Sequence, residues 1–250
     1  MISEETLKYI NDTIRNTGVS FFGYSDLRNT LTGTGWLESL ATGITIGVNL
    51  NQFIMNQIKD KPTFSYFHHY RTVNAMLDKA SLEISMSLEK LGYSAVPVPA
   101  SQTVKSNEEA YNIHGEKYTQ YSSIFPHKTA AVKAGLGWIG RNALFISNDF
   151  GPAVRLATVL TDSPLPVYKG EIPDIGKCGD CYECVKACPA MAITGEIWKP
   201  GEARDVLLDA KACSDYMNSE FKGIGRGSVC GLCIVSCKYF NRKYQDDIQS

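Results

Sequence analysis

The first 177 residues of this 250-residue chain contain no cysteine, because all eight cysteines lie between positions 178 and 237. The front of the chain therefore cannot supply a thiolate ligand to a metal. The rear segment holds all of them. A break in composition of this kind indicates a domain boundary.

The chain also lacks long apolar runs and an excess of charge of either sign. No window approaches the roughly 18 consecutive apolar residues that a membrane-spanning helix needs, and the acidic N-terminus lacks the pattern of a signal peptide. With 25 basic and 26 acidic residues, the formal charge is -1, so no overall field attracts nucleic acid. We therefore expect a cytoplasmic protein without membrane contact, in a reducing compartment that suits thiolate-bound metal.

The rear segment contains a dense cysteine run, Cys178-Gly-Asp-Cys181-Tyr-Glu-Cys184-Val-Lys-Ala-Cys188-Pro189. Its spacing, C-x2-C-x2-C-x3-C-P, is typical of proteins in which three thiolates hold one iron-sulfur cube and the fourth ligates a second cube. A second run, Cys230-x2-Cys233-x3-Cys237, repeats the later half of the pattern, and Cys213 supplies the remaining thiolate. The eight cysteines thus form two sets of four.

The proline turn after the three-residue spacer directs the fourth sulfur away from the first cube, so we predict ligand sets that cross between the two runs. Zinc sites and a disulfide scaffold are the alternatives. Zinc also takes four thiolates but rarely uses this succession of spacings, and disulfide scaffolds belong to small secreted chains. One 4Fe-4S cluster is predicted on Cys178, Cys181, Cys184 and Cys237, and the other on Cys188, Cys213, Cys230 and Cys233.

The front of the chain predicts an α/β (α+β) fold in which helices cover a sheet. Residues 1–165 are expected to form this domain, and residues 166–250 a small cluster domain that follows a linker rich in proline and glycine. The predicted helices span residues 3–18, 70–91 and a segment from about 128, and the predicted strands span residues 19–24, 44–50, 143–147 and 154–161.

Gly135-x-Gly137-x-x-Gly140 formally matches the fingerprint of a dinucleotide-binding fold. That fingerprint needs a strand before it and a helix after it, with an acidic residue about 20 positions later. Asp162 has the right offset, but a helical segment precedes the glycines and a strand-like segment follows them. The reversed order argues against a nicotinamide site. The glycines instead indicate backbone that passes close to a packed element or to a flat cofactor.

Three stretches carry a family resemblance: residues 127–142, residues 151–162, and the cysteine runs with Gly225-Arg-Gly227 before the second. Together they resemble epoxyqueuosine reductase, whose architecture corrinoid-dependent reductive dehalogenases share. The resemblance implies a nitroreductase-like domain that binds cobalamin, followed by a ferredoxin-like domain with two 4Fe-4S clusters. It also implies that an external low-potential donor, of ferredoxin or flavodoxin type, supplies electrons through the clusters to cobalamin, whose Co(I) state reduces the substrate.

The resemblance implies that cobalamin contacts lie in the glycine-rich stretch and on the strand that follows it. These residues are Gly135, Leu136, Gly137, Trp138, Ile139, Gly140, Asn142 and Arg155. No histidine has an aspartate two residues before it, so the chain lacks the D-x-H-x-x-G run that binds cobalt through histidine.

The proton donor of the family is an aspartate, and counting back from Ala134 without gaps places Tyr121 at that position. A phenol with a pKa of about 10 can protonate a carbanion-like product while it stays neutral at pH 7. Tyr121 is therefore the predicted donor. His127 and His114 are the alternatives.

The substrate stays open between an epoxyqueuosine-type nucleoside and a small molecule such as an organohalide. Family members usually continue into helical repeats that help to hold tRNA, whereas this chain stops thirteen residues after Cys237. We therefore expect a short form without the C-terminal repeat domain, for which tRNA binding is unsettled. Two other functions stay open: a ferredoxin-type electron-transfer protein without a corrin, and a flavin-dependent reductase.

Overall fold

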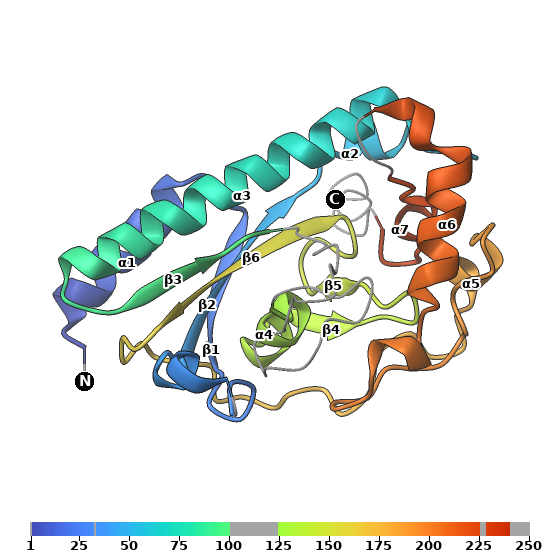
Figure 1. Cartoon of the computed structure of the whole chain (residues 1–250). Helices are drawn as coiled ribbons and strands as arrows, with labels where there is room; N and C mark the ends of the chain where they lie inside the picture. Colours follow the sequence, from blue (N-terminus) through green and yellow to red (C-terminus); the bar gives the residue numbers. More distant parts are fainter. Residues whose placement is uncertain (1, 33, 101–124, 226–228, 241–250) are drawn as a thin grey trace, which may run out of the picture. The chain divides into compact units, whose positions relative to one another are not determined.

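A computed structural model describes residues 2–32, 34–100, 125–225 and 229–240 of the chain (Figure 1). The chain divides into two compact units whose segments alternate along the sequence. The predicted domain division at residue 165 stays a prediction. The first unit consists of Met1–Val48, Asn74–Leu136 and Arg155–Ile172, and the second unit of Asn49–Val73, Gly137–Val154 and Pro173–Ser250.

A four-stranded sheet forms the centre of the first unit, with the strand order β1-β2-β6-β3 (Figure 1). Strand β1 pairs antiparallel with β2, with Phe21 opposite Gly47, and β3 pairs antiparallel with β6. Strands β1, β2 and β6 were predicted, with ends that differ by at most two residues, whereas β3 was not predicted. The bounds are β1 Phe21–Asp26, β2 Thr42–Asn49, β3 Ala95–Val98 and β6 Val154–Thr161.

Helices cover both faces of this sheet, as neighbouring residues of β1 show. Because successive side chains of a strand point to opposite faces, Tyr24 and Gly23 face different layers. The Tyr24 hydroxyl donates to Oδ1 of Asn11 in helix α1 (Glu4–Asn16) at 2.7 Å. Gly23 lies against Leu136, just after helix α4 (His127–Lys133). The described residues therefore have a mixed helix and sheet fold, in agreement with the predicted class.

Local sequence explains where helix α1 begins and ends. The Ser3 hydroxyl accepts a hydrogen bond from the backbone N–H of Thr6, and two glutamates in the first turn favour the positive end of the helix. Ile10 and Ile14 are buried on one face. Gly18, in the left-handed region with a φ of 79°, follows the last turn.

Helix α3 spans Phe64–Lys90 and begins six residues before the predicted start at residue 70. The Thr63 hydroxyl accepts from the backbone N–H of Tyr66 at 3.1 Å, which places the cap at Thr63. Gly92, with a φ of 84°, follows the helix. No helix within the described residues is both long enough and apolar enough to cross a bilayer.

The second unit contains an antiparallel pair of short strands, β4 (Gly137–Ile139) and β5 (Phe145–Ser147). Strand β4 was not predicted, because its glycines mask the strand pattern. The order helix α4, strand β4, strand β5 is the reverse of a dinucleotide fingerprint. Short helices make up most of the rest: α2 Gln52–Met55, α5 Glu183–Lys186, α6 Ala210–Glu220 and α7 Leu232–Val235, with 3-10 turns at Arg204–Val206 and Lys222–Ile224.

Gly137 provides a test of this strand pair. A Cβ atom at Gly137 would overlap the backbone carbonyl oxygen of Ile146 on β5, which cannot move without breaking the pair. We expect Gly137→Ala to lower the free energy of unfolding by about 3 kcal/mol, measured by urea denaturation. Gly223→Ala is the control, because the space beside Gly223 is open. Equal stability of the two variants would contradict the packing.

Candidate metal centre

Helices α5 and α7 of the second unit pack against each other, and each carries a cysteine from one of the two runs. Cys184 lies in α5 and Cys233 lies in α7. A further cysteine follows each helix after the three-residue spacer, Cys188 in one case and Cys237 in the other. The two runs therefore form similar local structures that face each other through short helices.

The first group of thiols lies around Cys237. The pKa of Cys237 is raised to about 11, chiefly by burial, and the neighbouring thiols of Cys178, Cys184 and Cys181 contribute to the rise. Burial also raises the pKa of Cys184, again with contributions from Cys178 and Cys181. These four cysteines therefore lie within electrostatic reach of one another.

The second group lies around Cys213 and Cys233. Burial raises the pKa of Cys213 to about 11, with Cys188 and Cys230 as the neighbouring thiols. The pKa of Cys233 is raised well above its usual value, first by burial and then by Cys230 and Cys213. Cys184 of the first group also contributes to Cys233, so the two groups are neighbours.

These two groups have the same members as the two predicted ligand sets. Ligation of a cluster by either set stays a prediction. Within the described part of the chain, no three His, Cys, Asp or Glu side chains converge closely enough to hold one metal ion.

Backbone N–H groups point at several of the sulfurs. The N–H of Arg141 donates to the sulfur of Cys178 at 3.5 Å, and the N–H of Ala192 donates to that of Cys188 at 3.4 Å. The N–H of Tyr239 lowers the pKa of Cys237, against the larger effect of burial. Hydrogen bonds to thiolate sulfur stabilise its negative charge, and in iron-sulfur proteins they help to set the reduction potential.

The chain after Cys237 folds back onto the start of the first cysteine run. Lys238 Nζ donates to the carbonyl of Cys178 at 2.9 Å, and the Tyr239 hydroxyl donates to the carbonyl of Lys177 at 2.7 Å. The rings of Tyr239 and Trp138 meet edge to face, with centroids 5.0 Å apart. This return brings Cys237 to the three cysteines from which it is separated by about 50 residues of sequence.

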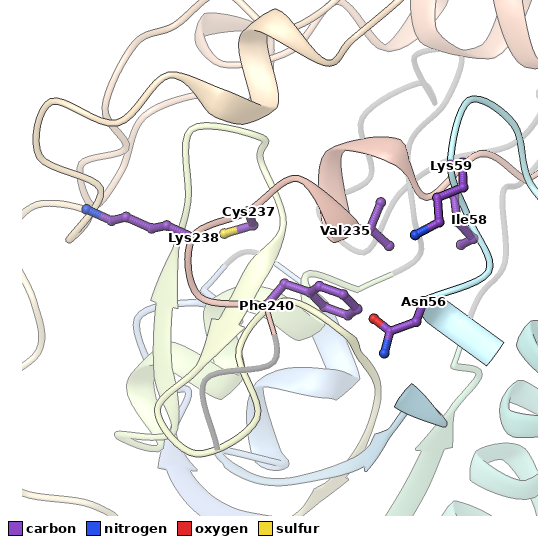
Figure 2. Close-up of a pocket in the computed structure, with 7 residues that line it drawn as sticks. All are labelled: Asn56, Ile58, Lys59, Val235, Cys237, Lys238 and Phe240. Atoms are coloured by element: carbon purple, nitrogen blue, oxygen red, sulfur yellow. The ribbon is translucent and has the colours of Figure 1, made fainter. Parts of the chain in front are cut away.

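A cavity of about 380 Å³ borders this part of the second unit (Figure 2). Cys237 of the first group is one of its lining residues. Figure 2 shows the Lys238 side chain extending away from Phe240 and Asn56. The lining residues are Asn56, Ile58, Lys59, Val235, Cys237, Lys238 and Phe240.

The glycine-rich run packs against protein at each glycine. A Cβ at Gly135 would meet the ring of Tyr168 at 2.6 Å, and one at Gly140 would meet Ile146 at 2.6 Å. Gly137 lies against the Ile146 carbonyl, as described above. Of the two explanations that the sequence left open, a packed element accounts for all three glycines.

The other predicted cobalamin contacts are held within the protein to different degrees. Trp138 and Ile139 are buried, and Asn142 donates to the carbonyl of Cys233 at 3.1 Å. Leu136 is half-buried against Gly23. Arg155, also half-buried, donates to Oδ1 of Asn74 at 2.9 Å. Their contact with a corrin stays a prediction.

Of the predicted proton donors, only His127 lies within the described residues; Tyr121 and His114 fall outside them. The Nε2–H of His127 donates to the Pro99 carbonyl at 2.8 Å, because that oxygen can only accept, and Nδ1 then accepts from the Thr158 hydroxyl at 2.9 Å. Burial lowers the pKa of His127 to about 4. The imidazole is therefore neutral at pH 7, with both nitrogens bonded.

Arg141 was not singled out from the sequence, yet it contacts the cysteine run directly. Its guanidinium donates to the carbonyls of Gly195 and Gly179, the latter at 2.6 Å, and lies over the Tyr182 ring at 4.2 Å. The sequence did contain a signal for Arg141, because it is a charged residue within an otherwise apolar, glycine-rich run. An arginine in such a run is buried only when it has hydrogen-bonding partners.

The chain is similar to proteins that are named as reductases. The fold resembles a reductive dehalogenase whose structure suggests a mechanism for B12-dependent dehalogenation, with a TM-score of 0.63 and 18% identity over 91% of this chain and 30% of that one. It also resembles an epoxyqueuosine reductase solved with an epoxyqueuosine-modified tRNA stem loop, with a TM-score of 0.55 and 17% identity over 96% of this chain and 66% of that one.

In sequence, the similarity is to epoxyqueuosine reductase. The enzyme of Cyclobacterium marinum is 35% identical over 152 residues, which cover 56% of this chain and 45% of that protein. The predicted resemblance is confirmed, although the chain matches less than half the length of this relative. No family model matches the chain.

Proposed function

We propose that this chain is a reductase of the epoxyqueuosine reductase type, which carries two 4Fe-4S clusters and passes electrons through them to a bound cobalamin. The observation that carries the proposal is the grouping of eight thiols into two neighbouring sets of four. An external low-potential donor of ferredoxin or flavodoxin type supplies the electrons. The units correspond, in this proposal, to nitroreductase-like and ferredoxin-like parts.

The spacing of the cysteines favours two cubanes over two zinc ions. A tetrahedral zinc site needs four sulfurs at about 2.3 Å from a single centre. A cubane offers a separate iron to each thiolate, so its ligands need not converge on one point. The N–H groups directed at the sulfurs of Cys178 and Cys188 support the cubane. Burial of several thiols in each set suits an iron-bound thiolate, whose charge the metal neutralises.

The cobalamin rests on the resemblance, since one structural relative is named for B12-dependent dehalogenation. Residues 135–142 give it no independent support, because protein atoms fill the space beside Gly135, Gly137 and Gly140. Cobalamin binding by this chain is therefore the property to measure.

The decisive experiment is an anaerobic titration of the reconstituted protein with cobalamin, followed by absorbance and EPR. We expect about eight irons per chain, from two cubes of four, and a Co(II) signal without nitrogen coupling, because the chain lacks the run that supplies a histidine ligand. Two intact clusters without any retained corrin would overturn the cobalamin part. A chain that holds no iron would overturn the whole proposal.

The substrate we propose is an epoxyqueuosine-type modified nucleoside, free or within tRNA, since one structural relative was solved with such a stem loop. An organohalide is the second candidate, favoured by the similarity in fold to a reductive dehalogenase. Turnover assays with both substrates, under one reductant, separate the two. A ferredoxin-type carrier would reduce neither, and a flavin-dependent reductase would instead retain a yellow chromophore after anaerobic purification.

A further inference from the structure

Arg141 places a positive charge inside the second unit. Arg141 is only 4% exposed. Within the described residues, no Asp or Glu carboxylate forms an ion pair with it. Two backbone carbonyls and the face of Tyr182 are the contacts of its guanidinium. Dipoles of this kind compensate a buried charge only in part, so a nearby anion is expected.

Two buried N–H groups beside the first cysteine set have no hydrogen-bond partner within the described part of the chain. They are Nε of Arg141 and Nε1 of Trp138, an indole that is 3% exposed. Trp138 packs against Cys178, and Cys237 and Tyr239 pack against the same group of buried side chains. Buried donors without a partner are rare in native proteins, and each one calls for an acceptor.

Arg141 contacts the same cysteine run through both its backbone and its side chain. Its backbone N–H is bonded to the sulfur of Cys178, and its guanidinium is bonded to the carbonyl of Gly179, the next residue. Tyr182, under the guanidinium, lies between Cys181 and Cys184 in sequence. Both unpartnered donors therefore belong to residues that contact the first cysteine run.

We propose that Arg141 and Trp138 set the reduction potential of the cluster held by Cys178, Cys181, Cys184 and Cys237. Arg141 acts through its charge and Trp138 through its indole N–H. This inference rests on the proposed function, because it needs a cluster on these four thiolates. Both are positioning residues, since they touch ligands of the cluster and the run that carries them.

The physical reason follows from the charge that the cluster gains. A cube with four thiolates is already an anion, and the electron from the external donor adds one more negative charge. A buried cation and a buried N–H dipole beside the ligands stabilise the reduced state more than the oxidised state. They therefore raise the potential of this cluster, while the cluster on the other set responds less.

The test is an anaerobic potentiometric titration, followed by EPR, of the protein with both clusters loaded. We expect Arg141→Gln to lower the ratio of reduced to oxidised first cluster at fixed potential by about tenfold, or about 59 mV for one electron. Trp138→Phe, which keeps the ring and removes the N–H, is expected to lower it roughly threefold. The redox transition that is lost in the titration of Cys237→Ala belongs to the first cluster.

Arg141→Lys keeps the charge and removes the planar fork. In this variant we expect the ratio of reduced to oxidised first cluster at fixed potential to stay within about twofold of the wild-type ratio. This variant also decides the matter if Arg141→Gln fails to hold the cluster. A tenfold drop in this ratio in Arg141→Lys would contradict an electrostatic role for Arg141. It would indicate instead that the shape of the guanidinium matters.

Two substitutions in the same unit serve as controls, Arg204→Gln at an exposed ion pair with Asp205 and Trp198→Phe at a second buried tryptophan. Neither is expected to move either potential. Unchanged potentials in all Arg141 and Trp138 variants would overturn the inference while leaving the proposed function intact. Wild-type protein without iron would instead remove the proposed function, so the two failures are distinguishable.

Discussion

Cys181→Ala combined with Cys237→Ala is expected to leave one intact 4Fe-4S cluster, and Cys233→Ala combined with Cys237→Ala is expected to leave none. The reason is the crossed grouping, in which Cys237 lies with the first run although it follows the second in sequence. Iron should fall from about eight to about four per chain in the first double variant, and close to zero in the second. Iron analysis and EPR after anaerobic reconstitution provide the measurement.

The opposite pattern would show that each run holds its own cluster. Loss of both clusters in the Cys181 and Cys237 pair, with one retained in the Cys233 and Cys237 pair, would contradict the crossed sets. A pair within the second set, Cys188→Ala with Cys213→Ala, is the matched control. It should retain about four irons and keep the signal that the first double variant loses.

His127 is expected to make the stability of the protein depend on pH between about 6.5 and 4. Its pKa falls from 6.5 in the unfolded chain to about 4 in the fold, chiefly through burial. Within that window the unfolded chain binds a proton that the folded chain does not, so stability is full above pH 6.5 and falls as the pH falls. The loss should approach about 3 kcal/mol by pH 4.

The measurement is urea denaturation of wild type and His127→Gln at matched pH values. Glutamine can bond to the Pro99 carbonyl and the Thr158 hydroxyl but does not titrate. The difference between the two proteins isolates His127 from other acid effects, such as cluster loss. A pH dependence that is equal in both would contradict the neutral, internally bonded imidazole. His68→Gln, at an exposed position, is the control.

A neutral His127 with both nitrogens engaged is a poor proton donor at pH 7. Of the three candidates from the sequence, this argues against His127; Tyr121 and His114 both lie outside the described residues. We keep Tyr121 as the proposed donor. Its replacement by phenylalanine is the direct comparison in a turnover assay.

Several features of the protein followed from the sequence alone because their causes are local. Helix α1 begins after the cap at Ser3 and ends before Gly18, and both signals lie within a few residues of the helix ends that they determine. The cysteine spacings predict the ligand sets because a turn of known length fixes where the next sulfur can point. The order of helix and strand around Gly137 excluded a dinucleotide fold for the same reason.

Other features were decided only by the tertiary structure, because they depend on segments that are distant in sequence. The glycines of residues 135–142 fit against Tyr168 and Ile146, which no local pattern names as neighbours. Residues 49–73 and 137–154 join the cysteine-bearing segment in one compact unit. The burial of Arg141 depends on carbonyls at Gly179 and Gly195, about 40 and 50 residues away. Spacing can predict a ligand, but only packing determines which charges and donors surround it.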